Sequence, residues 1–327
     1  MNILVGIYSS VAAWNIPAGH VDRLRQEFPQ HVFLHAPTEA DVPALVREAD
    51  VAFMSELRPA HLAAAPRLRW VHSPAAGVGS MLFPAMVASP VLISNSRGMS
   101  ADSIAEHVLA LTLALFRKFP LAFRGQAARH WAQDEAMALP PLRVVQSSRV
   151  LIVGLGRIGA ACARRFAALG ADVTAVRRRM DQPVPEGVRA VHPVQQLHDV
   201  LPEADVVVIS AAQTADTRGL IGARELALMR RDGILVNVSR GKLVDERALA
   251  AALRDGVIGG AGLDVFEHEP LDPASPLWAL PNVLITPHTA GFRPDHWDAA
   301  TALFAENLRR FESGRPVLNE VDKRAGY

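Results

Sequence analysis

The sequence predicts an α/β protein with two doubly wound parallel sheets. Short apolar runs of strand length alternate with helical segments from the N-terminus onward, as is typical of parallel strands covered by helices on both faces. A second, more strongly apolar series of the same kind follows Pro140 and Pro141. The chain of 327 residues is also longer than one hydrophobic core usually spans, so we expect each series to form its own domain.

The first series fills the N-terminal part of the chain. Strands are expected at residues 3–8, 32–34, 51–54 and 91–94, with helices at residues 20–28 and 40–48 between them. The apolar density of residues 101–119 predicts a long packed helix that connects the two series. Its most apolar part, residues 108–116, is too short to span a bilayer, so no membrane partner is expected.

The second series contains the more continuous apolar runs. Strands are expected at residues 149–153, 172–176, 205–209, 234–238, 262–265 and 283–285. Runs of this kind indicate strands that are buried on both faces. Helices are expected at residues 160–169 and, near the C-terminus, at residues 298–312.

Composition argues against several classes of protein. The formal net charge is +1 and no run of like charge exceeds Arg177-Arg178-Arg179, so nucleic acid is not an expected partner. The single cysteine, Cys162, cannot form an intramolecular disulfide, and the N-terminus lacks the basic and apolar regions of a leader peptide. These features predict a cytoplasmic location. The histidines and aspartates lack the spacing of a metal site, so no metal is expected.

A glycine motif follows the first strand of the second series. It reads Gly154-Leu155-Gly156-Arg157-Ile158-Gly159 and leads into the helix expected at residues 160–169. Glycines at this spacing permit a tight turn, a close approach to a pyrophosphate and close packing of helix on strand. The helix N-terminus would then face the phosphates. Because the motif lies between a strand and a helix, and a second strand follows the helix, it predicts a dinucleotide site of the Rossmann type.

The end of the next strand indicates which dinucleotide is preferred. An acidic residue there would hold the adenosine ribose hydroxyls of NAD. The sequence instead has Arg177, Arg178 and Arg179, and no acid occurs until Asp181. Guanidinium groups suit a 2′-phosphate, so we expect NADP(H) to be preferred, with NAD(H) possible. The alternative interpretation is a solvated basic loop.

Three segments at the carboxyl ends of later strands carry groups for chemistry. Arg240, within Asn237-Val238-Ser239-Arg240-Gly241, can chelate a carboxylate and polarise the neighbouring carbonyl. His288, within Thr286-Pro287-His288, suits the proton donor that a carbonyl needs when it receives a hydride. Glu269, in the segment from Asp264 to Pro270, is the candidate carboxylate that fixes the tautomer of the imidazole.

Together these motifs resemble the D-isomer-specific 2-hydroxyacid dehydrogenase family, and within it the glyoxylate/hydroxypyruvate reductase-like branch. The resemblance implies that Arg240, Glu269 and His288 are catalytic. It implies that Asp264 contacts the nicotinamide carboxamide. The other cofactor contacts that it implies, beside the glycines, are Arg157, Ile158, Ala211, Ala212, Thr217, Val238 and Ser239. The substrate carboxylate would meet the backbone of Ala76, Gly77 and Val78, together with Arg240 and His288.

The resemblance also implies a domain arrangement. Residues 1–99 and 289–327 would form a discontinuous, flavodoxin-like substrate domain, and residues 100–288 a Rossmann cofactor domain inserted into it. The family dimerises through the cofactor domain, and the region near Arg129-His130-Trp131 resembles its dimer-side arm. This chain departs from the family in having Ser210 and Ala212 where His and Pro are frequent. Gly79 and Ser80 replace a more usual acidic or amide residue.

The sequence therefore predicts an oxidoreductase that moves a hydride between NAD(P)H and a small 2-oxo acid, giving a D-2-hydroxy acid. One alternative is oxidation of formate or phosphite on the same scaffold. Another is a cofactor-sensing binding protein of the corepressor type, against which the absence of visible peptide-docking extensions counts. The identity of the acid and the physiological direction are left open.

Overall fold

The chain folds into two compact units. The computed structural model describes residues 1–138 and 140–326. Unit 1 contains Met1–Met99 and the segment from Arg293 onward, and unit 2 contains Ser100–Phe292. The return to unit 1 comes after Phe292 rather than directly after His288, because the backbone amides of Thr289 and Ala290 donate to the carboxylate of Asp264 in unit 2.

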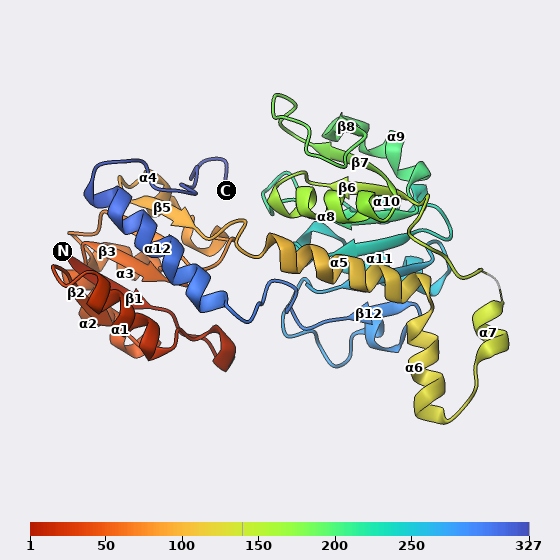
Figure 1. Cartoon of the computed structure of the whole chain (residues 1–327), viewed down its shortest axis with the longest axis horizontal. Coiled ribbons are helices and arrows are strands. Elements are labelled where there is room, and N and C mark those ends of the chain that lie inside the picture. The colour runs from red at the N-terminus through yellow and green to blue at the C-terminus, as the bar shows by residue number, and fades with distance from the viewer. Residues whose placement is uncertain (139, 327) are drawn as a thin grey trace. The chain divides into compact units, whose positions relative to one another are not determined.

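Unit 1 is built on a five-stranded sheet of order β2-β1-β3-β4-β5, in which all neighbours are parallel (Figure 1). The strands are β1 (Asn2–Gly6), β2 (Val32–His35), β3 (Val51–Met54), β4 (Trp70–Ser73) and β5 (Leu92–Asn95). This order is that of the flavodoxin-like doubly wound fold. The C-terminal segment adds an antiparallel bridge from Glu320 to Ser94 beside β5, which covers that edge of the sheet.

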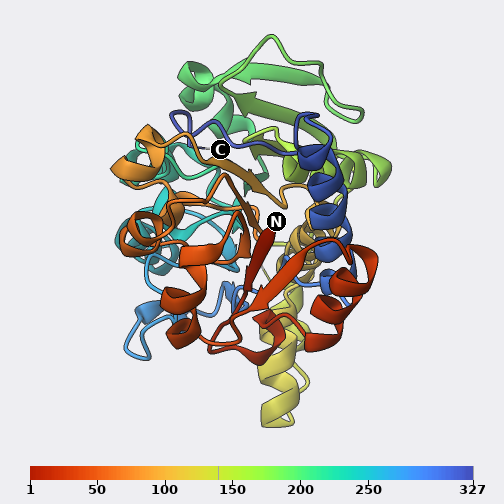
Figure 2. The same ribbon diagram turned by 90° about the vertical axis from the view of Figure 1, so that its left-hand side faces the viewer.

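Helices cover both faces of this sheet (Figure 2). They are α1 (Ala18–Glu27), α2 (Val42–Leu45), α3 (Pro59–Ala64), α4 (Pro84–Ala88) and α12 (His296–Glu312). Successive strand residues alternate between two cores. Ile3 packs with α1 and α12, whereas Leu4 packs on the other face with α2 and α4.

Unit 2 holds seven parallel strands in the order β12-β11-β10-β9-β6-β7-β8. They are β6 (Arg149–Val153), β7 (Asp172–Arg177), β8 (Ala190–Pro193), β9 (Val206–Ile209), β10 (Ile234–Asn237), β11 (Gly260–Leu263) and β12 (Val283–Ile285). The order is the Rossmann arrangement with one additional strand at its edge. It reverses between β6 and β9, where such sheets bind ligands at the carboxyl ends of their strands.

The helices of unit 2 also lie on both faces. They are α5 (Ala101–Phe116), α6 (Phe119–Ala128), α7 (Gln133–Met137), α8 (Arg157–Ala168), α9 (Leu197–Val200), α10 (Ala223–Leu228) and α11 (Glu246–Arg254). Helices α5 and α8 bury one face of the sheet, and α9, α10 and α11 bury the other. The structure therefore confirms two doubly wound parallel sheets, with the Rossmann unit inserted into the flavodoxin-like one.

Several elements differ from the sequence-based expectation. Strands β4 and β8 were not predicted. The helix expected at residues 101–119 ends at Phe116, because Lys118 adopts a left-handed conformation and α6 starts in a new direction. The helix expected at residues 40–48 is one turn of α-helix, α2, flanked by the 3-10 turns Glu39–Asp41 and Val46–Glu48.

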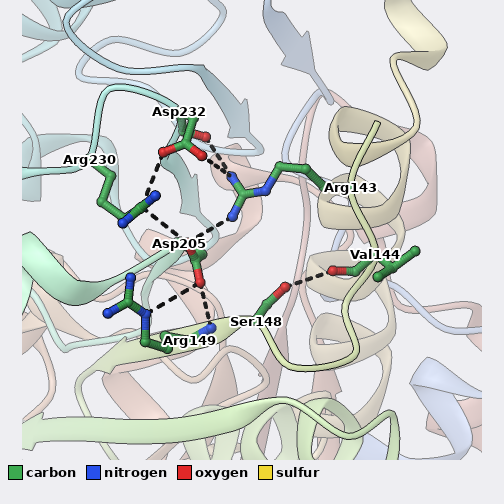
Figure 3. Close-up of polar contacts among 7 residues, drawn as sticks. All are labelled: Arg143, Val144, Ser148, Arg149, Asp205, Arg230 and Asp232. Carbon is green, nitrogen blue, oxygen red and sulfur yellow. Dashed lines mark hydrogen bonds and ion pairs between the residues drawn. The ribbon is translucent and has the colours of Figure 1, made fainter. Parts of the chain in front are cut away.

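A charged network anchors the chain where it enters β6 (Figure 3). The carboxylate of Asp205, just before β9, pairs with Arg143 at 3.0 Å and Arg230 at 3.2 Å and accepts the backbone N–H of Arg149 at 2.8 Å. The Arg143 guanidinium also stacks on Phe116 at the end of α5, 4.4 Å from the ring centroid. Asp205 and Arg143 are mostly buried, and their charges compensate one another. Asp232 completes the network by pairing with Arg230 at 3.1 Å and with Arg143 at 3.9 Å.

Removing the central carboxylate tests this anchor. We expect Asp205→Ala to destabilise unit 2 by about 2 kcal/mol, because the mostly buried Arg143 loses its nearer counter-charge, with Asp232 left at 3.9 Å, and the backbone N–H of Arg149 loses its acceptor. The measurement is the calorimetric unfolding transition of the full chain. The exposed neighbour Glu203 provides the control, and Glu203→Ala should change stability by less than about 0.5 kcal/mol. Equal effects of the two substitutions would show that the network is not an anchor.

Candidate active site

The glycine motif forms a tight turn between β6 and α8, with open space beside Gly156. A Cβ atom at Gly154, whose φ is +99°, would overlap the backbone of Ala211, and one at Gly159 would overlap the carbonyl of Gly154. By contrast, nothing lies within 4 Å of the Cβ position of Gly156. No side chain caps the first turn of α8, so its amide donors are available to an anion. These residues fit a bound pyrophosphate.

The three arginines at the end of β7 do not share one environment. Arg177 is buried, and its guanidinium donates to the carbonyl oxygens of Pro183, at 3.0 Å, and Gln182. It therefore holds the loop that follows β7, which corrects the expectation that it faces the cofactor. Arg178 and Arg179 are exposed at the end of the strand. These two residues are therefore the candidates for binding a 2′-phosphate.

The loop after β9 lies against the glycine loop. The Ser210 hydroxyl, at a position where the family often has histidine, donates to the carbonyl of Gly154 at 2.6 Å. Thr217 folds the loop back on itself, because its hydroxyl donates to the carbonyl of Ala212 at 2.8 Å. Ala211 thus sits beside the glycine loop, and Ala212 and Thr217 are held together further along.

Arg240 follows β10 in a loop that the Asn237 side chain organises. The Asn237 amide donates to the Arg240 carbonyl at 3.1 Å, and its oxygen accepts from the backbone and hydroxyl of Ser239. Val238 and Ser239, which lie within this turn, are buried. Gly241 then approaches so closely that a Cβ atom there would overlap the backbone of Phe266. This contact brings the loops after β10 and β11 together.

Glu269 and His288 are hydrogen-bonded, with Oε2 of Glu269 2.6 Å from Nδ1 of His288. The other carboxylate oxygen of Glu269 accepts the backbone N–H of Phe266 at 3.0 Å. The His288 side chain is 47% exposed, so its Nε2 edge can reach an external molecule. His288 itself has a left-handed backbone, with φ of 54°.

The charges of this site favour ionised Glu269 and cationic Arg240. Burial raises the pKa of Glu269, but the hydrogen bonds from His288 and Phe266, with the charges of His288 and Arg240, outweigh it, and the net pKa is lowered. Burial lowers the pKa of Arg240, and the Glu269 carboxylate opposes that effect. Arginine nevertheless stays protonated in proteins. The site thus combines a fixed cation with a carboxylate-supported imidazole.

Asp264, at the end of β11, is buried and already has several donors. Its Oδ1 accepts from the Thr286 hydroxyl at 2.6 Å and the Thr289 amide at 3.0 Å, and its Oδ2 accepts from the Ala290 amide at 3.0 Å. The nearest further group is His107 of α5, with Nε2 3.7 Å from Oδ1. Asp264 therefore ties the segment that contains His288 to the sheet.

In unit 1 the loop after β4 offers unused backbone donors. Ala76 and Gly77 are exposed, and no residue of the described chain accepts a hydrogen bond from the amides of residues 76–78. Asn95 holds the loop from behind by donating to the carbonyl of Ala76 at 2.7 Å. Beneath it, His72 is fully buried, which lowers its pKa to about 3 and keeps the imidazole neutral.

Other classes of site find no support in the residues that the structure describes. Within residues 1–138 and 140–326, no group of three His, Cys, Asp or Glu side chains is arranged to hold a metal ion. Over the same residues, no helix is long and apolar enough to cross a membrane. Cys162 is buried on α8, and burial raises its pKa to about 12, so its thiol is a poor nucleophile.

Comparisons with known proteins agree with this arrangement. Residues 109–290 match the family model for the D-isomer specific 2-hydroxyacid dehydrogenase NAD binding domain. A glyoxylate reductase of Thermococcus gammatolerans is 33% identical over 320 residues, which cover 94% of each chain.

Two solved structures have similar folds. A D-isomer specific 2-hydroxyacid dehydrogenase of Xanthobacter autotrophicus, in complex with NADPH and MES, has a TM-score of 0.84 and 35% identity over 99% of each chain. An NADPH-dependent glyoxylate/hydroxypyruvate reductase of Sinorhizobium meliloti, in complex with NADP and sulfate, has a TM-score of 0.84 and 28% identity over 100% of this chain and 99% of that one. The chain therefore belongs to the D-isomer specific 2-hydroxyacid dehydrogenase family.

Proposed function

We propose that this protein is an NADP(H)-preferring reductase of small 2-oxo acids such as glyoxylate or hydroxypyruvate, which it converts to 2-hydroxy acids, of D configuration where the product is chiral. The observation that carries the proposal is the 2.6 Å hydrogen bond between Glu269 and His288, beside the loop after β10 that holds Arg240. The glyoxylate reductase of Thermococcus gammatolerans and the Sinorhizobium meliloti reductase support this substrate class.

Each group has a distinct role in this reaction. When bound, the reduced nicotinamide supplies the hydride. Arg240 pairs with the substrate carboxylate and polarises the oxo group. His288 delivers a proton from Nε2 to the oxygen that becomes the hydroxyl, and Glu269 stabilises the imidazolium before transfer. In unit 1, the amides of residues 76–78 have no acceptor within the described chain and suit an anionic group, so unit 1 serves as the substrate domain and unit 2 as the cofactor domain.

A substrate panel tests the function directly. The purified chain is mixed with NADPH and glyoxylate, hydroxypyruvate, pyruvate or phosphohydroxypyruvate, and loss of NADPH absorbance is followed. We expect turnover with at least one small 2-oxo acid. No turnover with any member of the panel would overturn the proposed function.

The catalytic pair gives a prediction with two parts. His288→Ala should lower kcat by about 100-fold or more while NADPH binding persists, because the proton donor is lost. Glu269→Gln removes a carboxylate whose lowered pKa keeps it ionised at neutral pH. Activity of the wild type should therefore fall only in acid, when Glu269 is protonated below the ordinary pKa of a glutamate, and the already weak activity of Glu269→Gln should lack that acid limb.

The half-buried His192, in the edge strand β8, serves as the control for these measurements. His192→Ala should leave both kcat and the pH profile unchanged. Near-normal turnover by His288→Ala would remove that residue from the catalytic role.

The cofactor preference rests on the exposed arginines after β7. Arg178→Ala should raise KM for NADPH about tenfold or more and leave KM for NADH unchanged, because charge-assisted hydrogen bonds to the 2′-phosphate are lost. Arg231, exposed just before the amino end of β10 and so at the opposite end of the strands from the glycine loop, is the matched control. A wild-type preference for NADH would contradict the assignment.

Residues 119–138, here named the arm, support a homodimer through unit 2. The arm contains α6 and α7 and projects from the rest of unit 2 (Figure 1). It exposes Phe123 at 57%, Trp131 at 85% and Met137 at 68%. Large exposed apolar side chains on a projecting segment indicate a protein–protein interface. In this proposal a second copy of the chain packs against them.

Light scattering after size exclusion tests the dimer. The wild type should have the mass of two chains, and Phe123→Asp with Trp131→Asp should have the mass of one. Val184→Asp, at a similarly exposed apolar residue outside the arm, should remain dimeric. A monomeric wild type would contradict this part of the proposal. The cytoplasmic location remains a prediction from the sequence.

A further inference from the structure

We infer that His107, Thr286 and Asp264 form a hydrogen-bonded relay that positions His288 for proton transfer. The inference rests on the proposed catalytic role of His288. It goes beyond that role by naming three positioning residues, one of them on α5, about 180 positions away from His288 in the sequence.

The carboxylate of Asp264 is the centre of the relay. It accepts from the hydroxyl of Thr286 and from the backbone amides of Thr289 and Ala290, at distances of 2.6 to 3.0 Å. Its own backbone carbonyl accepts the N–H of His288 at 3.0 Å. Asp264 therefore binds the chain on both sides of His288 and at His288 itself.

The direction of each hydrogen bond follows from the number of protons that each group can donate. Thr286 has one hydroxyl proton, which it donates to the Asp264 carboxylate. The Nε2 atom of His107 lies 2.9 Å from the same hydroxyl oxygen, so it must donate to that oxygen. The imidazole of His107 therefore carries a proton on Nε2. The relay runs from His107 through Thr286 to Asp264.

The backbone of His288 shows why such a relay is needed. A φ of 54° places this residue in the left-handed region, which costs a non-glycine residue about 1–2 kcal/mol. Its side chain is about half exposed, and Glu269 is its hydrogen-bond partner. Without the bonds to Asp264, the turn can relax toward an ordinary conformation. The imidazole would then leave the carboxylate that orients it.

This interpretation goes beyond the expectation, implied by the family resemblance, that Asp264 contacts the nicotinamide carboxamide. The carboxylate is buried and already accepts three hydrogen bonds from its own chain. Its main task is then to fix the position of His288. The two roles predict different kinetics, because a positioning residue affects kcat and a carboxamide contact affects cofactor affinity.

The decisive variant is Thr286→Val, which keeps the shape of the side chain and removes the hydroxyl. We expect kcat to fall about tenfold, the equivalent of one lost hydrogen bond, while Kd for NADPH, measured by its fluorescence, changes by less than about twofold. Thr286→Ser restores the hydroxyl and should restore kcat. Thr112→Val is the matched control, because Thr112 is a buried threonine on α5 that donates to its own helix.

Hydrogen exchange gives a readout that does not depend on activity. In Thr286→Val and in Asp264→Asn, the amides of residues 288–290 should exchange faster than in the wild type, and in Thr112→Val they should not. Unchanged exchange in the first two variants would overturn the relay.

The kinetic outcomes separate this inference from the proposed function. Asp264→Asn with a raised Kd for NADPH and a normal kcat would assign the residue to the carboxamide and overturn the relay. A wild-type chain that reduces no 2-oxo acid would overturn the proposed function, while the exchange rates would still decide whether the relay exists.

Discussion

The close approach of Gly241 to the backbone of Phe266 is the constraint on which the site depends. Any side chain at position 241 would push apart the loops after β10 and β11. These loops carry Arg240 and Glu269, and the Glu269 carboxylate in turn bonds to His288 from the loop after β12. Three neighbouring strands thus deliver a cation, an anion and an imidazole to one edge of the sheet. Parallel strands make this possible because their carboxyl ends all face the same way.

The electrostatics of the site follow from partial burial. Arg240 loses hydration but keeps its charge, so its attraction for a carboxylate is stronger than at a fully hydrated surface. Glu269 remains ionised because hydrogen bonds and neighbouring positive charges outweigh the cost of burial. The exposed edge of His288 then combines access to a substrate with support from a fixed charge. Such a division suits an imidazole that must both hold and release a proton.

The two units use backbone groups in a similar way. In unit 2 an uncapped helix follows glycines that leave space for phosphates, and in unit 1 a loop exposes amides that have no acceptor among the described residues. A hydrogen bond from a small polar side chain fixes each loop. Ser210 donates to the glycine loop of unit 2, and Asn95 donates to the loop after β4 of unit 1. Polar groups of this kind fix a loop without occupying the side that faces a ligand.

The sequence by itself determined the apolar strands of both sheets and the glycine loop, because strand burial and glycine geometry leave local patterns. It also indicated Arg240, Glu269 and His288 by their motifs, and their catalytic roles stay a prediction. Strand β4 was missed because it contains His72, which is tolerated in the core only through hydrogen bonds to serines of β5 and the turn that follows it. Strand β8 was missed because it is short, half-buried and at an edge. Only the tertiary structure decided that Arg177 bonds to carbonyl oxygens of the loop that follows it. The same is true of the hydrogen bonds that link Asp264 to Thr286 and Thr286 to His107. Those contacts join residues far apart in the chain, and no local pattern encodes which distant groups a fold brings within hydrogen-bonding distance.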